Sequence, residues 1–205
     1  KPTAVADETG PLRLLVTGGS QGARVFNELV PDAVARLPEA LRQRLQVTQQ
    51  VRGSDTSEVR AAYDAAGVDA ELKSFFDDLP ERLTRAHLLI CRSGASTTTE
   101  LAAAGRPAIL VPYPFAADDH QTANAQAFAQ AGGGWLMPQN ALTPDALAER
   151  LQSLFETPSL LTRAAAGALS FAQPDSARRL ADLALEVPGN GATGPNPKTK
   201  KEAAA

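Results

Sequence analysis

Short apolar runs alternate with amphipathic stretches along most of the chain, and the two patterns predict strands and helices in turn. Apolar runs bounded by turn residues are typical of buried strands, whereas apolar residues that recur every three to four positions are typical of helices. The stretch after the first strand shows the helical pattern, with Val25, Phe26, Leu29, Val30 and Val34 on one face. Strands are predicted at residues 12–17, 45–50, 71–76, 88–91, 108–111 and 135–137. Helices are predicted at residues 25–37, 54–66, 79–85, 95–104, 121–131, 143–156, 160–169 and 175–186, with Ser54 as the expected N-cap of the second.

This alternation of strands and helices predicts an α/β domain with an open, parallel, doubly wound sheet of the Rossmann-like type. Ligands of such sheets bind beyond the carboxyl ends of the strands. Four loops follow predicted strands at that edge and carry polar or glycine-rich sequence. We therefore expect a composite site built from residues 18–23, 75–78, 92–100 and 113–124.

The segment from Ile90 to Leu101 is the centre of this expected site. It combines the end of a strand, a turn at Ser93 and Gly94, and the first turns of a helix that carries Glu100. Backbone N–H groups and the positive end of the helix dipole at such a junction suit a phosphate or a hydroxyl-rich ligand. The two oxygens of Glu100 could accept hydrogen bonds from both hydroxyls of a ribose. The alternative is an ordinary strand-to-helix connection with a solvated glutamate.

A glycine-rich loop, Gly18-Gly19-Ser20-Gln21-Gly22, follows the first predicted strand. It has neither the glycine spacing of the dinucleotide fingerprint nor the lysine of a P-loop. Its backbone could still approach an anion at the start of a helix, with Ser20 and Gln21 as additional donors. A tight turn without a ligand remains the alternative.

The composition of the chain excludes some classes of ligand and binding partner. The formal net charge is −3 and the isoelectric point is near 5.5, so no basic surface for nucleic acid is expected. The single cysteine, Cys91, excludes an internal disulfide and indicates a reducing compartment. The acidic pairs at 77–78 and 118–119 have no accompanying ligands, so capping or surface roles are favoured over a magnesium site. For His120, beside Gln121, a hydrogen bond to a ligand hydroxyl is favoured over base catalysis.

The expected organisation is a linker at residues 1–11, one domain at 12–187 and a disordered tail at 188–205. No apolar run is long enough for a membrane span and no leader pattern is present, so a cytoplasmic location is expected. The chain begins at Lys1, and its only methionine is Met137. We therefore expect a trimmed product or the C-terminal part of a longer protein.

Four motifs follow one another along the chain. They are Thr17-Gly18-Gly19-Ser20-Gln21-Gly22-Ala23-Arg24, Phe75-Phe76-Asp77-Asp78-Leu79, Cys91-Arg92-Ser93-Gly94-Ala95 continuing to Thr99-Glu100-Leu101, and Asp118-Asp119-His120-Gln121-Thr122-Ala123-Asn124-Ala125. In this order they resemble the C-terminal half of the MurG family of bacterial peptidoglycan glycosyltransferases, and the resemblance covers residues 12 to about 186. It implies the C-terminal domain of a two-domain GT-B glycosyltransferase, which needs no cofactor or bound metal.

The resemblance also implies a role for each matching residue. It implies that Glu100 holds the ribose hydroxyls and that the backbone at Phe76 reads the edge of the uracil. The residues implied to face the diphosphate are Ser20, Gln21, Gly94 and Ala95, with Arg92 as a neighbour. The residues implied to contact the sugar hydroxyls and the region near the phosphates are His120, Gln121 and Asn124.

The function implied by the resemblance is the transfer of N-acetylglucosamine (GlcNAc) from UDP-GlcNAc to a lipid-linked acceptor in peptidoglycan synthesis, with inversion at the anomeric carbon. The N-terminal half, which supplies the acceptor site and the general base in the family, is missing from this chain. We therefore expect the chain alone to bind donor without turnover, and the whole protein to lie at the cytoplasmic face of the inner membrane. The alternative is a non-catalytic nucleotide-sugar-binding subunit that recruits a catalytic partner.

Overall fold

The computed structural model describes residues 9–19, 24–53 and 56–186. Several predictions fall outside these ranges, namely most of the linker, the tail, Ser20, Gln21 and Ser54. The described chain divides into two units, one ending at Ala172 and one beginning at Gln173. The predicted domain limit at residue 187 therefore stays a prediction.

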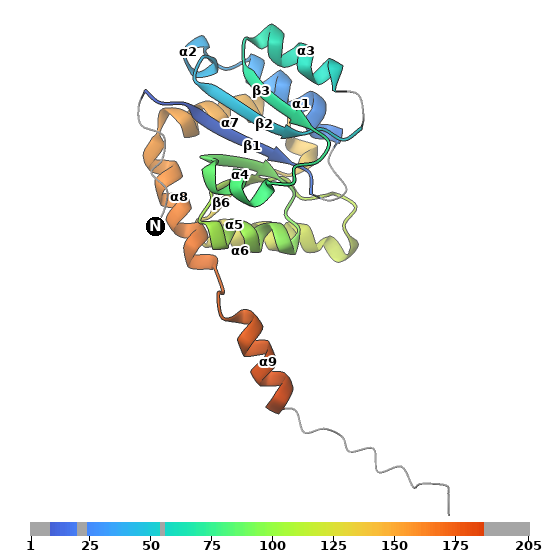
Figure 1. Cartoon of the computed structure of the whole chain (residues 1–205), viewed down its shortest axis with the longest axis vertical. Helices are drawn as coiled ribbons and strands as arrows, with labels where there is room; N and C mark the ends of the chain where they lie inside the picture. Colours follow the sequence, from blue (N-terminus) through green and yellow to red (C-terminus); the bar gives the residue numbers. More distant parts are fainter. Residues whose placement is uncertain (1–8, 20–23, 54–55, 187–205) are drawn as a thin grey trace, which may run out of the picture. The chain divides into compact units, whose positions relative to one another are not determined.

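The first unit is built on a six-stranded sheet in which every pairing is parallel (Figure 1). The strand order is β3-β2-β1-β4-β5-β6, so the chain moves outward from β1 to one edge, returns, and continues to the other edge. This arrangement confirms the predicted doubly wound sheet and places the switch in direction between β1 and β4. The strands are β1 (Leu12–Thr17), β2 (Leu45–Gln50), β3 (Asp69–Lys73), β4 (Leu88–Cys91), β5 (Ala108–Leu110) and β6 (Gly134–Leu136).

Helices cover both faces of the sheet (Figure 1). The burial of the β4 side chains shows how the helices pack against it. Successive side chains of β4 point to opposite faces of the sheet, and all four are buried because helices cover both faces. Leu88 and Ile90 pack in the core shared with α1 (Arg24–Ala35), α3 (Ser57–Ala66) and α7 (Pro144–Glu156). Leu89 and Cys91 pack in the core shared with α4, α5 and α6, which are Leu79–Arg85, Ala95–Ala104 and His120–Gln130.

Three short features and one longer helix complete the first unit. Helix α2 (Glu39–Arg42) was not predicted from the sequence, because four residues are too few to show a helical period. The 3₁₀ turns at Ala117–Asp119 and Gln139–Ala141 precede α6 and α7. Helix α8 (Pro158–Phe171) runs a little beyond the predicted limits at both ends.

The third strand differs from its prediction at residues 71–76. It occupies Asp69–Lys73, pairs with β2 only, and so forms an edge of the sheet. Its alternating exposed positions suit an edge strand, whereas Phe75 and Phe76 belong to the loop that follows. Thr56 occupies the N-cap position of α3, so the predicted start at residue 54 was too early.

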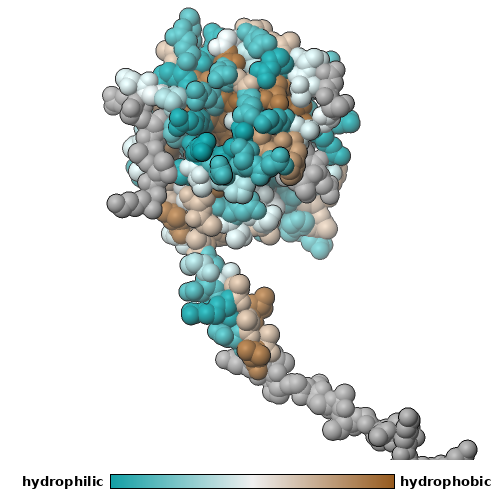
Figure 2. Space-filling view, in the orientation of Figure 1, coloured by the Kyte–Doolittle hydropathy of each residue, from teal (hydrophilic) through white to brown (hydrophobic). Residues whose placement is uncertain are grey.

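The second unit contains α9 (Ser176–Glu186). Its leucines Leu180, Leu183 and Leu185 are exposed. Figure 2 shows hydrophilic residues along one side of this helix and hydrophobic residues along another. Across the described ranges, none of the helices combines the length and the apolar character that crossing a membrane requires.

Candidate functional site

A cavity of about 390 Å³ lies where the strands end, beside the turn that leads into α5. Its walls come from the segments after β1, β2, β4 and β5, so three of the four loops expected from the sequence meet there. The expected loop at residues 75–78 is not part of the lining, whereas the loop after β2, which was not expected, contributes Arg52. The lining residues are Gly18, Gly19, Arg52, Arg92, Gly94, Ser96, Thr97, Tyr113, Phe115, Ala116, His120 and Gln121.

Four of the predicted site residues line this cavity: Arg92, Gly94, His120 and Gln121. Phe76, Ala95, Glu100 and Asn124 lie outside the lining, and Ser20 and Gln21 lie outside the described residues. Glu100 is exposed on α5, three residues after Thr97, which does line the cavity. The two positions therefore share a helical face, so Glu100 can still face a ligand that extends beyond the cavity.

Among the lining residues, Arg52 alone lies outside the four loops expected from the sequence. It follows β2, so the rule that ligands bind at the carboxyl ends of strands could have found it. Tyr113 and Phe115 lie within the expected loop at 113–124, although no role was predicted for their side chains. The rings of Tyr113 and Phe115 pack edge to face, with 5.6 Å between their centroids, and both side chains are exposed to solvent.

The turn before α5 presents a helix start to the cavity. Gly94 is the N-cap residue and has extended backbone, with φ −62° and ψ 155°. Its carbonyl accepts the N–H of Thr98, while the hydroxyl of Thr99 donates back to the carbonyl of Ala95 at 2.8 Å. Gly94 has no side chain to cap the first N–H groups of α5, so this end can receive an anion.

Ser93, Gln121 and Asn124 join the start of α5 to the start of α6. The hydroxyl of Ser93 donates to the carbonyl of Gln121 at 2.8 Å, and Asn124 Nδ2 donates to the carbonyl of Ser93 at 3.0 Å. Gln121 Oε1 accepts the backbone N–H of Tyr113 at 3.0 Å. The predicted sugar contacts of Gln121 and Asn124 stay predictions, and the structure adds a scaffold role for both.

One ring nitrogen of His120 makes a hydrogen bond within the protein. Its Nδ1 lies 2.7 Å from the carbonyl oxygen of Ala117. Because a carbonyl oxygen can only accept, Nδ1 carries the proton, and in the neutral ring Nε2 is left as an acceptor. This tautomer suits a hydrogen bond from a sugar hydroxyl, which is the role favoured for His120 from the sequence.

Arg92 is a buried cation at the back of the cavity. Its Nη1 donates to the carbonyls of Val111 and Pro112 at 3.2 and 3.0 Å, and its Nη2 donates to Gln139 Oε1 at 2.7 Å. The guanidinium also lies 5.3 Å from the ring centroid of Phe26. Burial lowers the pKa of Arg92, but an arginine stays charged at neutral pH. The described partners are neutral, so the positive charge favours an anion in the cavity.

Phe76 and Phe75 lie in the loop between β3 and α4. Phe76 is buried, whereas the side chain of Phe75 is 68% exposed.

Residues 9–19, 24–53 and 56–186 contain no group of three or more His, Cys, Asp or Glu side chains arranged to hold a metal ion.

A doubly wound parallel sheet with a cavity at the carboxyl ends of its strands is the arrangement of nucleotide-binding α/β domains. Residues 13–180 match the model of the glycosyltransferase family 28 C-terminal domain, and the chain belongs to this family.

Relatives and solved structures agree with this assignment. The chain is 66% identical over 171 residues to the "UDP-N-acetylglucosamine--N-acetylmuramyl-(pentapeptide) pyrophosphoryl-undecaprenol N-acetylglucosamine transferase" of Rhodospirillum rubrum, covering 83% of this chain and 44% of the relative. It is similar to the crystal structure of Acinetobacter baumannii MurG, with a TM-score of 0.77 and 36% identity over 84% of this chain and 51% of that one. The glycosyltransferase WaaG of lipopolysaccharide biosynthesis shares the fold, with a TM-score of 0.65 and 21% identity over 90% of this chain and 48% of that one.

The chain spans about half the length of the curated relatives that it matches. The resemblance to the C-terminal half of the MurG family and the predicted GT-B fold class are thereby confirmed.

Proposed function

We propose that this chain is the donor-binding half of an inverting glycosyltransferase that moves GlcNAc from UDP-GlcNAc to a lipid-linked acceptor, forming lipid II from lipid I in peptidoglycan synthesis. One observation carries the proposal: 66% identity over 171 residues to a relative whose name states this transfer. The cavity at the carboxyl edge supports it, because its glycines, helix start and buried cation suit a nucleoside diphosphate.

The proposed donor site extends along the edge of the sheet. The backbone at Phe76 reads uracil, and Glu100 accepts hydrogen bonds from the ribose hydroxyls. The diphosphate lies at the start of α5, near Gly94 and Ala95, with Arg92 supplying positive charge from behind. His120 accepts from a sugar hydroxyl, and Gln121 and Asn124 keep that wall in place.

These groups meet the negative charge that develops as the diphosphate leaves. Preorganised N–H groups and a buried cation stabilise such a charge better than water does, because they do not have to reorient during the reaction. We expect the acceptor groove and the general base in the half of the relatives that this chain does not match. Transfer requires both substrates to be held together, so the chain alone binds donor without turnover.

The partners that follow from the proposal are UDP-GlcNAc, the N-terminal acceptor domain and, through that domain, the lipid-linked acceptor. Since the donor and the acceptor meet where a cytoplasmic nucleotide sugar reaches a lipid carrier, we place the complete protein at the cytoplasmic face of the inner membrane.

Titration calorimetry of the chain with UDP-GlcNAc, UDP-glucose and UMP tests the proposal. We expect saturable binding of UDP-GlcNAc, weaker binding of UDP-glucose, and weaker binding again of UMP, which has no second phosphate. The proposal fails if no uridine nucleotide binds.

A further inference from the structure

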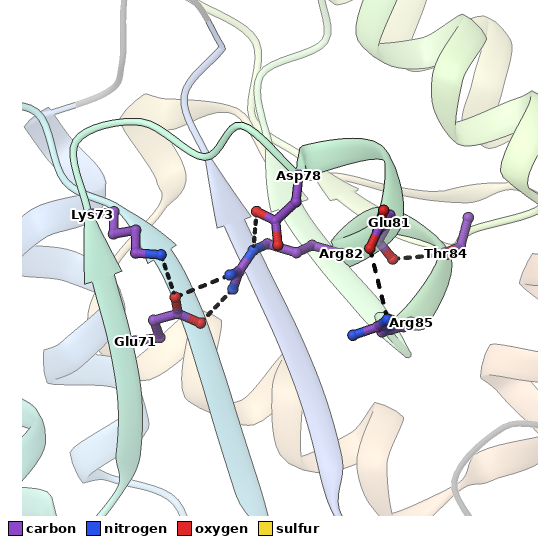
Figure 3. Close-up of polar contacts among 7 residues, drawn as sticks. All are labelled: Glu71, Lys73, Asp78, Glu81, Arg82, Thr84 and Arg85. Atoms are coloured by element: carbon purple, nitrogen blue, oxygen red, sulfur yellow. Dashed lines mark hydrogen bonds and ion pairs between the residues drawn. The ribbon is translucent and has the colours of Figure 1, made fainter.

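Arg82 lies at the centre of an ion-pair network behind the loop that joins β3 to α4 (Figure 3). Its Nη1 and Nη2 donate to the two carboxylate oxygens of Glu71, the second at 3.0 Å. Its Nε donates to Asp78 Oδ1 at 2.7 Å. One guanidinium thus binds two carboxylates, with the paired geometry towards Glu71 that only arginine can form.

The network connects the two ends of the loop between β3 and α4. Glu71 lies on β3, and Asp78 is the N-cap residue of α4, so the loop of residues 74–77 runs between the two carboxylates that Arg82 holds. Lys73 adds an ion pair to Glu71 at 2.9 Å. Figure 3 shows Glu71 and Asp78 pointing towards Arg82, and Lys73 pointing towards Glu71. The pKa values of Glu71 and Asp78 are both lowered, mainly by hydrogen bonds from Arg82.

The same guanidinium also packs on the loop itself. Its Cζ atom lies 4.5 Å from the ring centroid of Phe76, and Lys73 Nζ lies 5.6 Å from that centroid. The side chain of Arg82 is only 19% exposed, so the cation–π contact is largely screened from water. The ring of Phe76 is buried, which fixes the direction of the backbone that carries it.

We infer that Arg82 is a positioning residue for recognition of the nucleotide base, acting through the backbone of Phe76. The inference rests on the proposed function, in which that backbone reads uracil. Uracil presents a carbonyl acceptor beside an N3–H donor, whereas cytosine presents an amino donor beside an N3 acceptor. A peptide held in one orientation matches the first pattern and opposes the second, so the rigidity of the loop sets the preference for uracil.

The chain offers a matched control in Arg85, one turn later on α4. Arg85 pairs with Glu81 at 3.8 Å, and both side chains are more than 70% exposed. Its ion pair is of the exposed kind that contributes little to stability. Replacing it changes the charge of α4 by the same amount as replacing Arg82.

The test measures the affinities of the chain for UDP, CDP and methylenediphosphonate by calorimetry, for Arg82→Ala, Arg82→Lys, Glu71→Gln and Arg85→Ala. We expect Arg82→Ala to weaken UDP about tenfold, because the loop that carries the backbone of Phe76 is no longer held in one orientation, and to bring the UDP-to-CDP affinity ratio towards one. For Arg82→Lys and Glu71→Gln we expect UDP affinities and UDP-to-CDP ratios between those of Arg82→Ala and the unsubstituted chain. For Arg85→Ala we expect the same values as for the unsubstituted chain. Methylenediphosphonate, which has no base, binds all variants equally.

A role confined to stability would lower the melting temperature without changing the UDP-to-CDP ratio, and that result overturns the inference. An equal affinity of the unsubstituted chain for UDP and CDP overturns it as well. If Arg82→Ala does not fold, the UDP-to-CDP ratios of Arg82→Lys and Glu71→Gln test the inference instead. If the unsubstituted chain binds no UDP, the proposed function fails with it, whereas an unchanged ratio in variants that bind UDP rejects the role of Arg82 alone.

Discussion

Asn124 donates a hydrogen bond from Nδ2 to the carbonyl oxygen of Ser93, at 3.0 Å, across 31 residues of sequence. The hydroxyl of Ser93 returns a hydrogen bond to the first turn of α6, at the carbonyl of Gln121. The pair fixes the turn before α5 against the start of α6. Since both segments contribute walls to the cavity, the shape of the candidate site depends on these two contacts.

Replacing Asn124 by alanine removes the donor to Ser93. We expect the free energy of unfolding to fall by about 1 kcal/mol, as for a typical hydrogen bond. UDP-GlcNAc affinity should fall about tenfold, because the two walls lose their fixed spacing. Chemical denaturation and calorimetry measure the two effects. Asn140→Ala, at an exposed position, is the control, and equal behaviour of the two variants would contradict the scaffold role.

Gly94→Ala separates the fold from the site. The backbone of Gly94 is in a region open to any residue, and an added Cβ would meet only Thr97 Oγ1, at 3.9 Å. We expect stability to fall by no more than about 1 kcal/mol, because alanine is a poorer N-cap than glycine. UDP affinity should fall by at least about tenfold, because the added methyl group would stand where a phosphate is proposed to approach the helix start. Retention of full affinity would show that the diphosphate does not lie against this turn.

Glu100→Ala should weaken UDP by about 1.5–3 kcal/mol, the range for hydrogen bonds to a charged group. The same substitution should have a much smaller effect on a uridine diphosphate that lacks the ribose hydroxyls, because Glu100 has nothing to accept from it. Calorimetry with both nucleotides measures the difference. Equal weakening of the two ligands would count against the ribose role.

Tyr63 gives the stability of the domain a dependence on high pH. Its hydroxyl donates to Gln49 Oε1 at 2.6 Å in the core, and burial raises the pKa of Tyr63 well above 10. In the unfolded chain the phenol ionises near pH 10, while in the folded chain it stays protonated. Its contribution is therefore complete below pH 10 and is lost above it, by up to about 1.4 kcal/mol per pH unit.

Tyr63→Phe should remove this part of the pH dependence and should also lower stability at pH 7, because Gln49 Oε1 loses its donor. Urea denaturation at pH 8 to 11 measures both effects, with the exposed Tyr113→Phe as the control. Burial also raises the pKa of Cys91 to about 12, and both variants keep that contribution. Parallel pH profiles for Tyr63→Phe and the unsubstituted chain would contradict this assignment.

Most of the sheet could be predicted because its central strands, such as Leu88–Cys91, are continuous apolar runs buried on both faces. The edge strand β3 was shifted because its exposed positions are polar, while the adjacent Phe75 and Phe76 carry the apolar signal. The ring of Phe76 is buried against Arg82, a contact between a loop and a helix that no periodic pattern shows.

The position of the site could be predicted for a similar reason. Parallel topology brings the loops after the strands to one edge, whatever their sequence. The hydrogen bonds of Arg92 and Asn124 within the protein could not be predicted, because their partners lie 19 to 47 residues away and become neighbours only in the folded chain. The sequence located three of the segments that line the cavity, but it indicated neither Arg52 nor which polar side chains bind the protein itself.

The most direct test of the proposed donor site is a titration of the ¹⁵N-labelled chain with UDP, followed by backbone amide chemical shifts. We expect saturable shifts at the carboxyl ends of the strands, at Gly19, Phe76, Gly94 and His120. We expect no change at the amino ends of the strands, where Gln46 and Asp69 lie at the beginnings of β2 and β3. An absence of shifts, or shifts confined to the amino ends of the strands, would contradict the assignment of the donor site.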